Sequence, residues 1–129
     1  MKIMKSAEDY LEMMLMLQEK HGYIRSVDIA AALGVSKPSV SYAAKRLREN
    51  GYISMADDSR ITLLPKGREI AERIYERHRV LTRLFVSLGV DEKTAQEDAC
   101  KVEHDLSEAT FDAIRRMLFG GGYERGRSV

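Results

Sequence analysis

The 129-residue sequence has one cysteine, two prolines and no tryptophan. A single cysteine cannot form a disulfide within the chain, so the composition fits a reducing compartment and we expect a cytoplasmic protein. There is no secretory signal and no apolar run long enough to cross a bilayer, which argues against a membrane role. The His-Glu-x-x-His and Gly-x-Ser-x-Gly motifs and a glycine-rich phosphate loop are also missing, so the sequence does not predict an enzyme.

The net charge is only +1, but the charges are unevenly distributed along the chain. Residues 36–49 carry four basic side chains and one acidic side chain, a local balance of +3. Residues 91–112 carry eight acidic and two basic side chains, a balance of −6. A basic segment suits contact with phosphates and an acidic segment suits cation binding, although ordinary solvated helix faces would give the same pattern.

Apolar residues recur at helical spacing through most of the chain, which predicts a mainly α-helical fold. We expect helices over residues 6–21, 26–33, 37–50, 65–88 and 107–119, and a further helix that begins at Asp91. Residues 52–54 and 61–63 read as a short β-hairpin with a polar tip between them. On the long helix we place Ile70, Ile74, Leu81, Phe85 and Leu88 on the inward side.

The order helix, short turn at Gly34, helix and hairpin is typical of a winged helix-turn-helix in which the hairpin is the wing. The helix after the turn would enter the major groove. Small hydroxyl residues at its start allow close approach to DNA, and basic residues further along suit phosphate contact. The candidate DNA-contacting residues are Ser36, Lys37, Pro38, Ser39, Ser41, Tyr42, Lys45, Arg46 and Arg48, together with Arg60 on the wing. A three-helix core with no DNA role would have the same apolar stripes.

The run from Cys100 to His104 contains three residue types that bind transition metals. If this segment is helical, the spacing of three and four residues places Cys100, Glu103 and His104 on one face. Taken singly, each has a structural interpretation: a small buried thiol, a solvated acid and a hydrogen-bonded core imidazole. Converging on one point, the three would form a divalent metal site.

Three residues elsewhere would complete such a site. Asp9 and Glu12 share a helix face, and His78 lies between Ile74 and Leu81 on the inward side of the long helix. Acidic, thiol and imidazole groups at partly buried positions are costly without a counter-charge, which a divalent ion supplies. The six groups suffice for one octahedral ion or for two ions that share carboxylates. The alternatives are helix-dipole complementation by the two acids and a core role for the imidazole.

Five stretches together resemble the diphtheria-toxin-repressor family of metal-activated bacterial repressors. They are residues 6–12, 36–41, 63–67, 77–79 and 100–107, and the resemblance runs from about residue 3 to residue 118. It implies a winged helix-turn-helix DNA-binding domain over residues 1–64 and a helical metal-binding and dimerisation domain over residues 65–119. We expect a flexible tail over residues 120–129. The family also implies a homodimer that binds palindromic double-stranded operators.

The resemblance assigns ligand roles and gives a mixed indication of the metal. Asp9 and Glu12 match carboxylate ligands of the manganese-dependent branch, whereas the iron-dependent branch generally has Met in place of Asp9. Cys100 matches the iron-dependent branch, and the manganese-dependent branch usually has Glu there. Glu103, His104 and His78 match ligands of both branches. We therefore expect Fe(II) or Mn(II) as cofactor, one or two ions per subunit, and no organic cofactor.

The combined prediction is a metal-dependent transcriptional repressor of metal-ion homeostasis. Two other classes stay open. One is a winged-helix regulator that responds to an organic ligand or a protein partner, with a purely structural polar cluster. The other is a metalloenzyme with an open coordination position, which the missing catalytic motifs disfavour.

Overall fold

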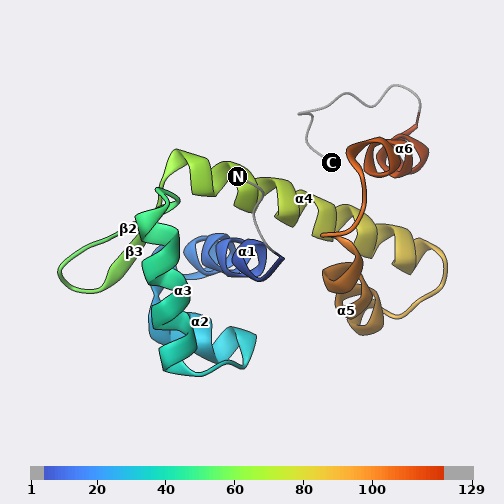
Figure 1. Cartoon of the computed structure of the whole chain (residues 1–129). Coiled ribbons are helices and arrows are strands. Elements are labelled where there is room, and N and C mark those ends of the chain that lie inside the picture. The colour runs from blue at the N-terminus through green and yellow to red at the C-terminus, as the bar shows by residue number, and fades with distance from the viewer. Residues whose placement is uncertain (1–4, 121–129) are drawn as a thin grey trace. The chain divides into compact units, whose positions relative to one another are not determined.

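A computed structural model describes residues 5–120, and these residues are mainly helical with one small sheet (Figure 1). The elements are α1 (Lys5–His21), β1 (Ile24–Arg25), α2 (Ser26–Leu33), α3 (Lys37–Glu49), β2 (Ile53–Met55), β3 (Arg60–Leu63), α4 (Pro65–Ser87), α5 (Glu92–Val102) and α6 (Glu108–Phe119). The predicted fold class, a mainly α winged helix-turn-helix followed by a helical domain, is confirmed. Contacts divide the chain into two compact units, residues 1–74 and 75–129. The division falls within α4, ten residues after the expected domain boundary.

The first unit is built on three helices that bury one apolar stripe each. Leu11 and Met14 of α1, Ile29 of α2 and Val40 of α3 are completely buried. Helical spacing places such residues on a common face, and their burial provides most of the drive to pack the helices. Between α2 and α3, Gly34 adopts a left-handed backbone with φ of 68°, which favours glycine and makes the short turn possible.

Helix α3 begins with a side-chain cap. The Ser36 hydroxyl oxygen accepts a hydrogen bond from the Ser39 backbone N–H at 3.2 Å. Pro38 lies in the first turn, where its missing N–H would have no partner within the helix. The N-terminal end of the predicted recognition helix is therefore fixed by local sequence.

The sheet has three strands, although the sequence predicted only two. The expected hairpin forms between β2 and β3, with Ser54 opposite Thr62. The third strand, β1, pairs with the other edge of β3 through Ile24 opposite Ile61 and Arg25 opposite Arg60. Ile24 and Ile61 are both buried, so their cross-strand contact joins the wing to the helical core.

The start of α4 passes very close to Tyr52, the residue just before β2. The Leu64 backbone N–H donates to the Tyr52 carbonyl oxygen at 3.0 Å. A Cβ atom added at Gly67 would overlap that same oxygen and would lie 3.0 Å from the Tyr52 carbonyl carbon. Only a residue without a side chain fits there.

We predict that Gly67→Ala destabilises the first unit. Alanine favours a helix by ~1 kcal/mol over glycine, but the overlap with backbone atoms forces a shift that overpacking data place at ~1–3 kcal/mol. The net result should be a lower midpoint of urea unfolding. Glu69→Ala, at an exposed position of the same helix, is the control and should be nearly neutral. If Gly67→Ala is as stable as the control, the close contact between residue 67 and the Tyr52 backbone is contradicted.

The second unit contains the later part of α4 together with α5 and α6. Asp91 and Ser107 cap α5 and α6 by accepting backbone N–H bonds from Thr94 and Thr110. The bond from Thr94 also lowers the pKa of the Asp91 carboxyl. Ala95 and Ala99 are completely buried, and small side chains four residues apart allow α5 to lie close to its neighbours.

Two expectations for this region need comment. Leu88 was placed on the inward side of the long helix, but it is 71% exposed. The reason is that α4 ends at Ser87 and Gly89 then adopts a φ of 99°, so the helical stripe stops before Leu88. Of the expected flexible tail at residues 120–129, Gly120 is the C-cap of α6 and residues 121–129 lie outside the described residues. Within residues 5–120, no helix combines the length and apolar character that a membrane span requires.

Candidate metal centre and DNA-contact surface

All ten predicted DNA-contacting residues are exposed. Nine belong to α3 or to its N-cap, and Arg60 begins β3 on the wing. The buried residues of α3 are Val40, Ala44 and Leu47. Because these three form the inner stripe, the basic residues lie on the remaining faces, where they can meet phosphates.

Two of these residues form a pre-arranged pair. The Arg46 guanidinium donates a hydrogen bond to the Tyr42 hydroxyl at 3.1 Å and lies 5.8 Å from the centre of the Tyr42 ring. This hydrogen bond raises the pKa of Arg46. Tyr42 is 64% exposed, so the pair presents a flat polar surface to solvent.

The structure adds Arg25, which sequence reasoning missed, beside the predicted Arg60. The guanidinium groups of Arg25 and Arg60 lie 5.0 Å and 5.3 Å from the centre of the Tyr23 ring, on which the His21 ring stacks at 5.7 Å. Arg25 belongs to β1, the strand that was not predicted. The available signal was the alternation of half-buried Tyr23, buried Ile24 and exposed Arg25, but two residues are too few for that pattern to stand out.

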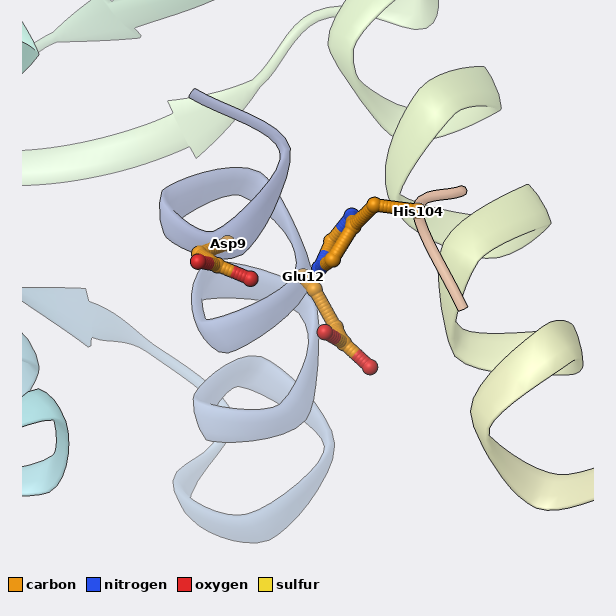
Figure 2. A group of neighbouring side chains, drawn as sticks. All are labelled: Asp9, Glu12 and His104. Atoms are coloured by element: carbon orange, nitrogen blue, oxygen red, sulfur yellow. The ribbon is translucent and has the colours of Figure 1, made fainter. Parts of the chain in front are cut away.

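In the first unit, α1 carries the predicted carboxylate pair. Asp9 and Glu12 project from α1 (Figure 2), and one oxygen of each lies within 4.8 Å of the other. Glu12 is 6% exposed. Their neighbour Glu8 is engaged by Arg73 through an ion pair of 3.1 Å. Two carboxylates at this spacing repel each other, and a shared cation would offset the repulsion.

In the second unit, the structure places one carboxylate between two imidazoles. Nδ1 of His78, on α4, is 2.8 Å from Oε1 of Glu103, and Nε2 of His104 is 3.7 Å from Oε2 of the same carboxylate. Glu103 is completely buried and ends α5 as its C-cap. His104 follows on the segment after α5 and is labelled in Figure 2. Imidazole nitrogens and a carboxylate are ligands for Mn(II), Fe(II) and Zn(II) alike.

The structure does not group Cys100 with Glu103 and His104. We expected Cys100, Glu103 and His104 to point the same way on a continuous helix. However, α5 ends at Val102, and Cys100 is exposed whereas Glu103 is buried. Among residues 5–120, Cys100 joins no group of three or more acidic, thiol or imidazole side chains with ligand atoms close together. The residue brought to Glu103 instead is His78, from a different helix.

The donor types fit a divalent transition metal. Asp9 and Glu12 offer carboxylate oxygens, and the second unit adds one more carboxylate and two imidazoles. Oxygen and nitrogen donors of this kind suit Mn(II) and Fe(II), and a thiolate would shift the preference toward softer ions. Proton loss must accompany binding, because imidazoles and thiols bind metals in their unprotonated forms.

Comparison with known proteins supports this interpretation. Residues 2–60 match the N-terminal DNA-binding domain of the iron-dependent repressors, and residues 64–120 match the metal-binding and dimerisation domain of the same family. An uncharacterised HTH-type transcriptional regulator of Methanocaldococcus jannaschii is 37% identical over 116 residues, which cover 88% of this chain and 93% of that protein. The transcriptional regulator MntR of Salmonella typhimurium is 39% identical over 107 residues, which cover 83% of this chain and 68% of MntR.

A solved manganese-dependent transcriptional repressor in complex with manganese has a similar fold. It superposes with a TM-score of 0.80 at 28% sequence identity, over 88% of this chain and 52% of the repressor. The chain thus spans about half the length of that solved relative. The iron-dependent repressor family that this chain matches comprises transcriptional regulators rather than enzymes. On these matches along most of its length, the chain belongs to the diphtheria-toxin-repressor family of metal-dependent transcriptional repressors.

Proposed function

We propose that this chain represses transcription as a homodimer on a palindromic DNA operator, and that Fe(II) or Mn(II) activates it. The observation that carries the proposal is the Glu103 carboxylate between the imidazoles of His78 and His104. A buried carboxylate between two imidazoles is costly as a purely structural feature, and a bound divalent ion offsets that cost. A repressor of this kind would act in the cytoplasm, where the chromosome is accessible.

The proposed ligands come from both units. They are Asp9 and Glu12 on α1, His78 on α4, Cys100 on α5, and Glu103 and His104 after it. We propose that both sets serve the same ion or the same pair of ions. The carboxylate pair on α1 supports this, because a second oxygen-rich half-site is what a six-coordinate ion would need beyond two imidazoles and one carboxylate.

Sharing of an ion would make DNA binding responsive to metal. Without the ion, we expect the acidic groups to repel one another and the spacing of the two units to vary. With both sets engaged on one ion, the recognition helices of a dimer could be held about one DNA turn apart. Metal and DNA affinities should then be coupled reciprocally, typically by ~1–3 kcal/mol.

The metal itself is the finer part of the proposal. Mn(II) is supported by the similarity to MntR and to the manganese-bound repressor, and by the carboxylates of Asp9 and Glu12. Fe(II) is supported by the thiol of Cys100, since a thiolate favours softer ions.

DNA binding with and without metal tests the function. The probe is a fluorescent duplex selected from a random pool by the Mn(II)-loaded protein, and anisotropy reports its affinity. We expect binding to tighten by about 5- to 150-fold on adding Mn(II) or, under anaerobic conditions, Fe(II). Equal affinity in metal-free and metal-loaded protein would exclude the switch.

A variant of α3 separates DNA contact from metal binding. The double substitution Lys45→Ala/Arg48→Ala should weaken binding on all sequences and reduce the slope of log affinity against log salt by about 2. Its Mn(II) affinity in the absence of DNA should equal that of the wild type. Lys93→Ala, which removes an exposed charge from α5, is the matched control and should leave the salt slope unchanged.

A further inference from the structure

A buried arginine holds the segment that carries two of the proposed ligands. Arg77 is only 4% exposed, and its Nη1 atom donates hydrogen bonds to the carbonyl oxygens of Glu103 at 3.1 Å and Leu106 at 2.6 Å. Its Nη2 atom lies 3.4 Å from the Glu108 carboxylate. One guanidinium therefore bonds to both ends of residues 103–106.

The Glu103 carbonyl needs a donor because Glu103 is the C-cap of α5. The last carbonyl groups of a helix have no partner within the helix. The Glu103 backbone N–H donates to the Ala99 carbonyl oxygen at 2.9 Å, and the Asp105 N–H donates to the Val102 carbonyl oxygen at 3.0 Å. These two bonds connect the segment to α5. Arg77 supplies the bonds on the carbonyl side, and its positive charge suits a helix C-terminus.

The position of Arg77 in the chain connects its hydrogen bonds to residues 103–106 with the cluster of Glu103, His78 and His104. Arg77 precedes His78 on α4, so one short stretch of helix provides both the donor to the Glu103 carbonyl and the imidazole at the Glu103 carboxylate. Arg77 therefore holds the backbone of Glu103, and His78 contacts its side chain.

We propose that Arg77 is a positioning residue for the metal centre: its guanidinium fixes residues 103–106, so that Glu103 and His104 face His78 before metal binds. The inference rests on the proposed function, because it assumes that these side chains are ligands. Positioning groups outside the ligand set contribute to affinity because they spare the ligands a reorganisation on binding.

Arg115 offers a matched control. It is equally buried, at 4% exposed, and stacks on the same Phe111 ring as Arg77, with guanidinium-to-ring distances of 5.2 Å and 5.1 Å. Arg115 bonds to the carboxylates of Glu76 at 2.8 Å and Asp112 at 2.7 Å. Lysine at either position keeps the charge but loses the planar fork of donors.

The first experiment measures Mn(II) affinity by the electron paramagnetic resonance signal of unbound Mn(II), together with the melting temperature. Both Arg77→Lys and Arg115→Lys should lower the melting temperature. Arg77→Lys should weaken Mn(II) binding by about 10-fold or more, and Arg115→Lys by less than about 3-fold. Equal weakening by the two variants would give Arg77 a general structural role and overturn the inference, as would an unchanged affinity in Arg77→Lys.

The second experiment needs no metal. Hydrogen exchange of the metal-free protein should be faster over residues 103–106 in Arg77→Lys than in the wild type, and unchanged there in Arg115→Lys. Unchanged exchange over residues 103–106 in Arg77→Lys would contradict the claim that Arg77 fixes this segment. Wild-type protein that binds neither Mn(II) nor Fe(II) would contradict the proposed function instead, so the two failures are distinguishable.

Discussion

Replacement of His104 by alanine should weaken Mn(II) binding on the order of 100-fold, because even a group that only supports a metal ligand typically contributes about 10- to 100-fold to the affinity and His104 is proposed as a ligand itself. His104 faces the Glu103 carboxylate at 3.7 Å, so the variant loses one of the two imidazoles around that buried acid. DNA binding in the presence of Mn(II) should fall to the level of the metal-free wild type. Isothermal titration with metal and anisotropy with DNA measure the two effects.

The remaining histidines provide the comparison. His21→Ala removes an exposed imidazole of α1 that stacks on Tyr23, and its Mn(II) affinity should match that of the wild type. His78→Ala should resemble His104→Ala, because His78 lies 2.8 Å from the other oxygen of Glu103. If His104→Ala lowers the stability of the metal-free protein but keeps full metal-dependent DNA binding, the cluster is structural and the proposed ligand role is wrong.

Helix starts were predictable because their causes are local. Ser36, Asp91 and Ser107 each accept a backbone N–H bond from the residue three positions later, and a small polar residue before an apolar stripe is sufficient to recognise such a cap. Helix ends were less predictable. No glycine or proline marks the end of α5, and Glu103 keeps helical backbone angles as the C-cap. No local signal therefore indicated that α5 stops before Glu103 and His104.

Features that depend on residues far apart in sequence were not predictable from local patterns. Strand β1 is two residues long and exists through its pairing with β3, more than thirty residues later. The family resemblance placed the domain boundary after residue 64, at the start of α4. In the structure the first turns of α4 contact the first unit, through Gly67 beside Tyr52 and Arg73 bonded to Glu8. These contacts attach the start of α4 to the first unit, whereas the family matches divide the chain near residue 64, where the boundary was expected.

The candidate metal centre was predictable in part. The sequence indicated the chemistry of Asp9, Glu12, His78, Glu103 and His104, since each residue type binds metals. It did not show that Glu103 would have one imidazole near each oxygen, nor that Arg77 would bond to the backbone on both sides of His104. Those contacts depend on how α4 packs near the end of α5.

Replacement of Cys100 by serine should change which metals bind more than whether metals bind. A thiolate bonds strongly to Zn(II) and Co(II) and weakly to Mn(II), so Cys100→Ser should weaken Zn(II) and Co(II) binding by about 10-fold or more and Mn(II) binding much less. The wild type loaded with Co(II) should also show a near-ultraviolet thiolate-to-cobalt charge-transfer band that the variant lacks. Competition titrations and absorption spectra of the two anaerobic proteins measure these changes.

The exposure of Cys100 on the last turn of α5 makes this substitution decisive. Lys101→Ser, at the next exposed position, controls for the effect of serine on the end of the helix. A selective loss of the softer metals in Cys100→Ser alone would make the thiol a ligand and favour Fe(II) among the physiological candidates. Identical affinities and no charge-transfer band would remove Cys100 from the site. The proposed ligands would then be the carboxylates of Asp9, Glu12 and Glu103 with the two imidazoles, a set of oxygen and nitrogen donors that suits Mn(II).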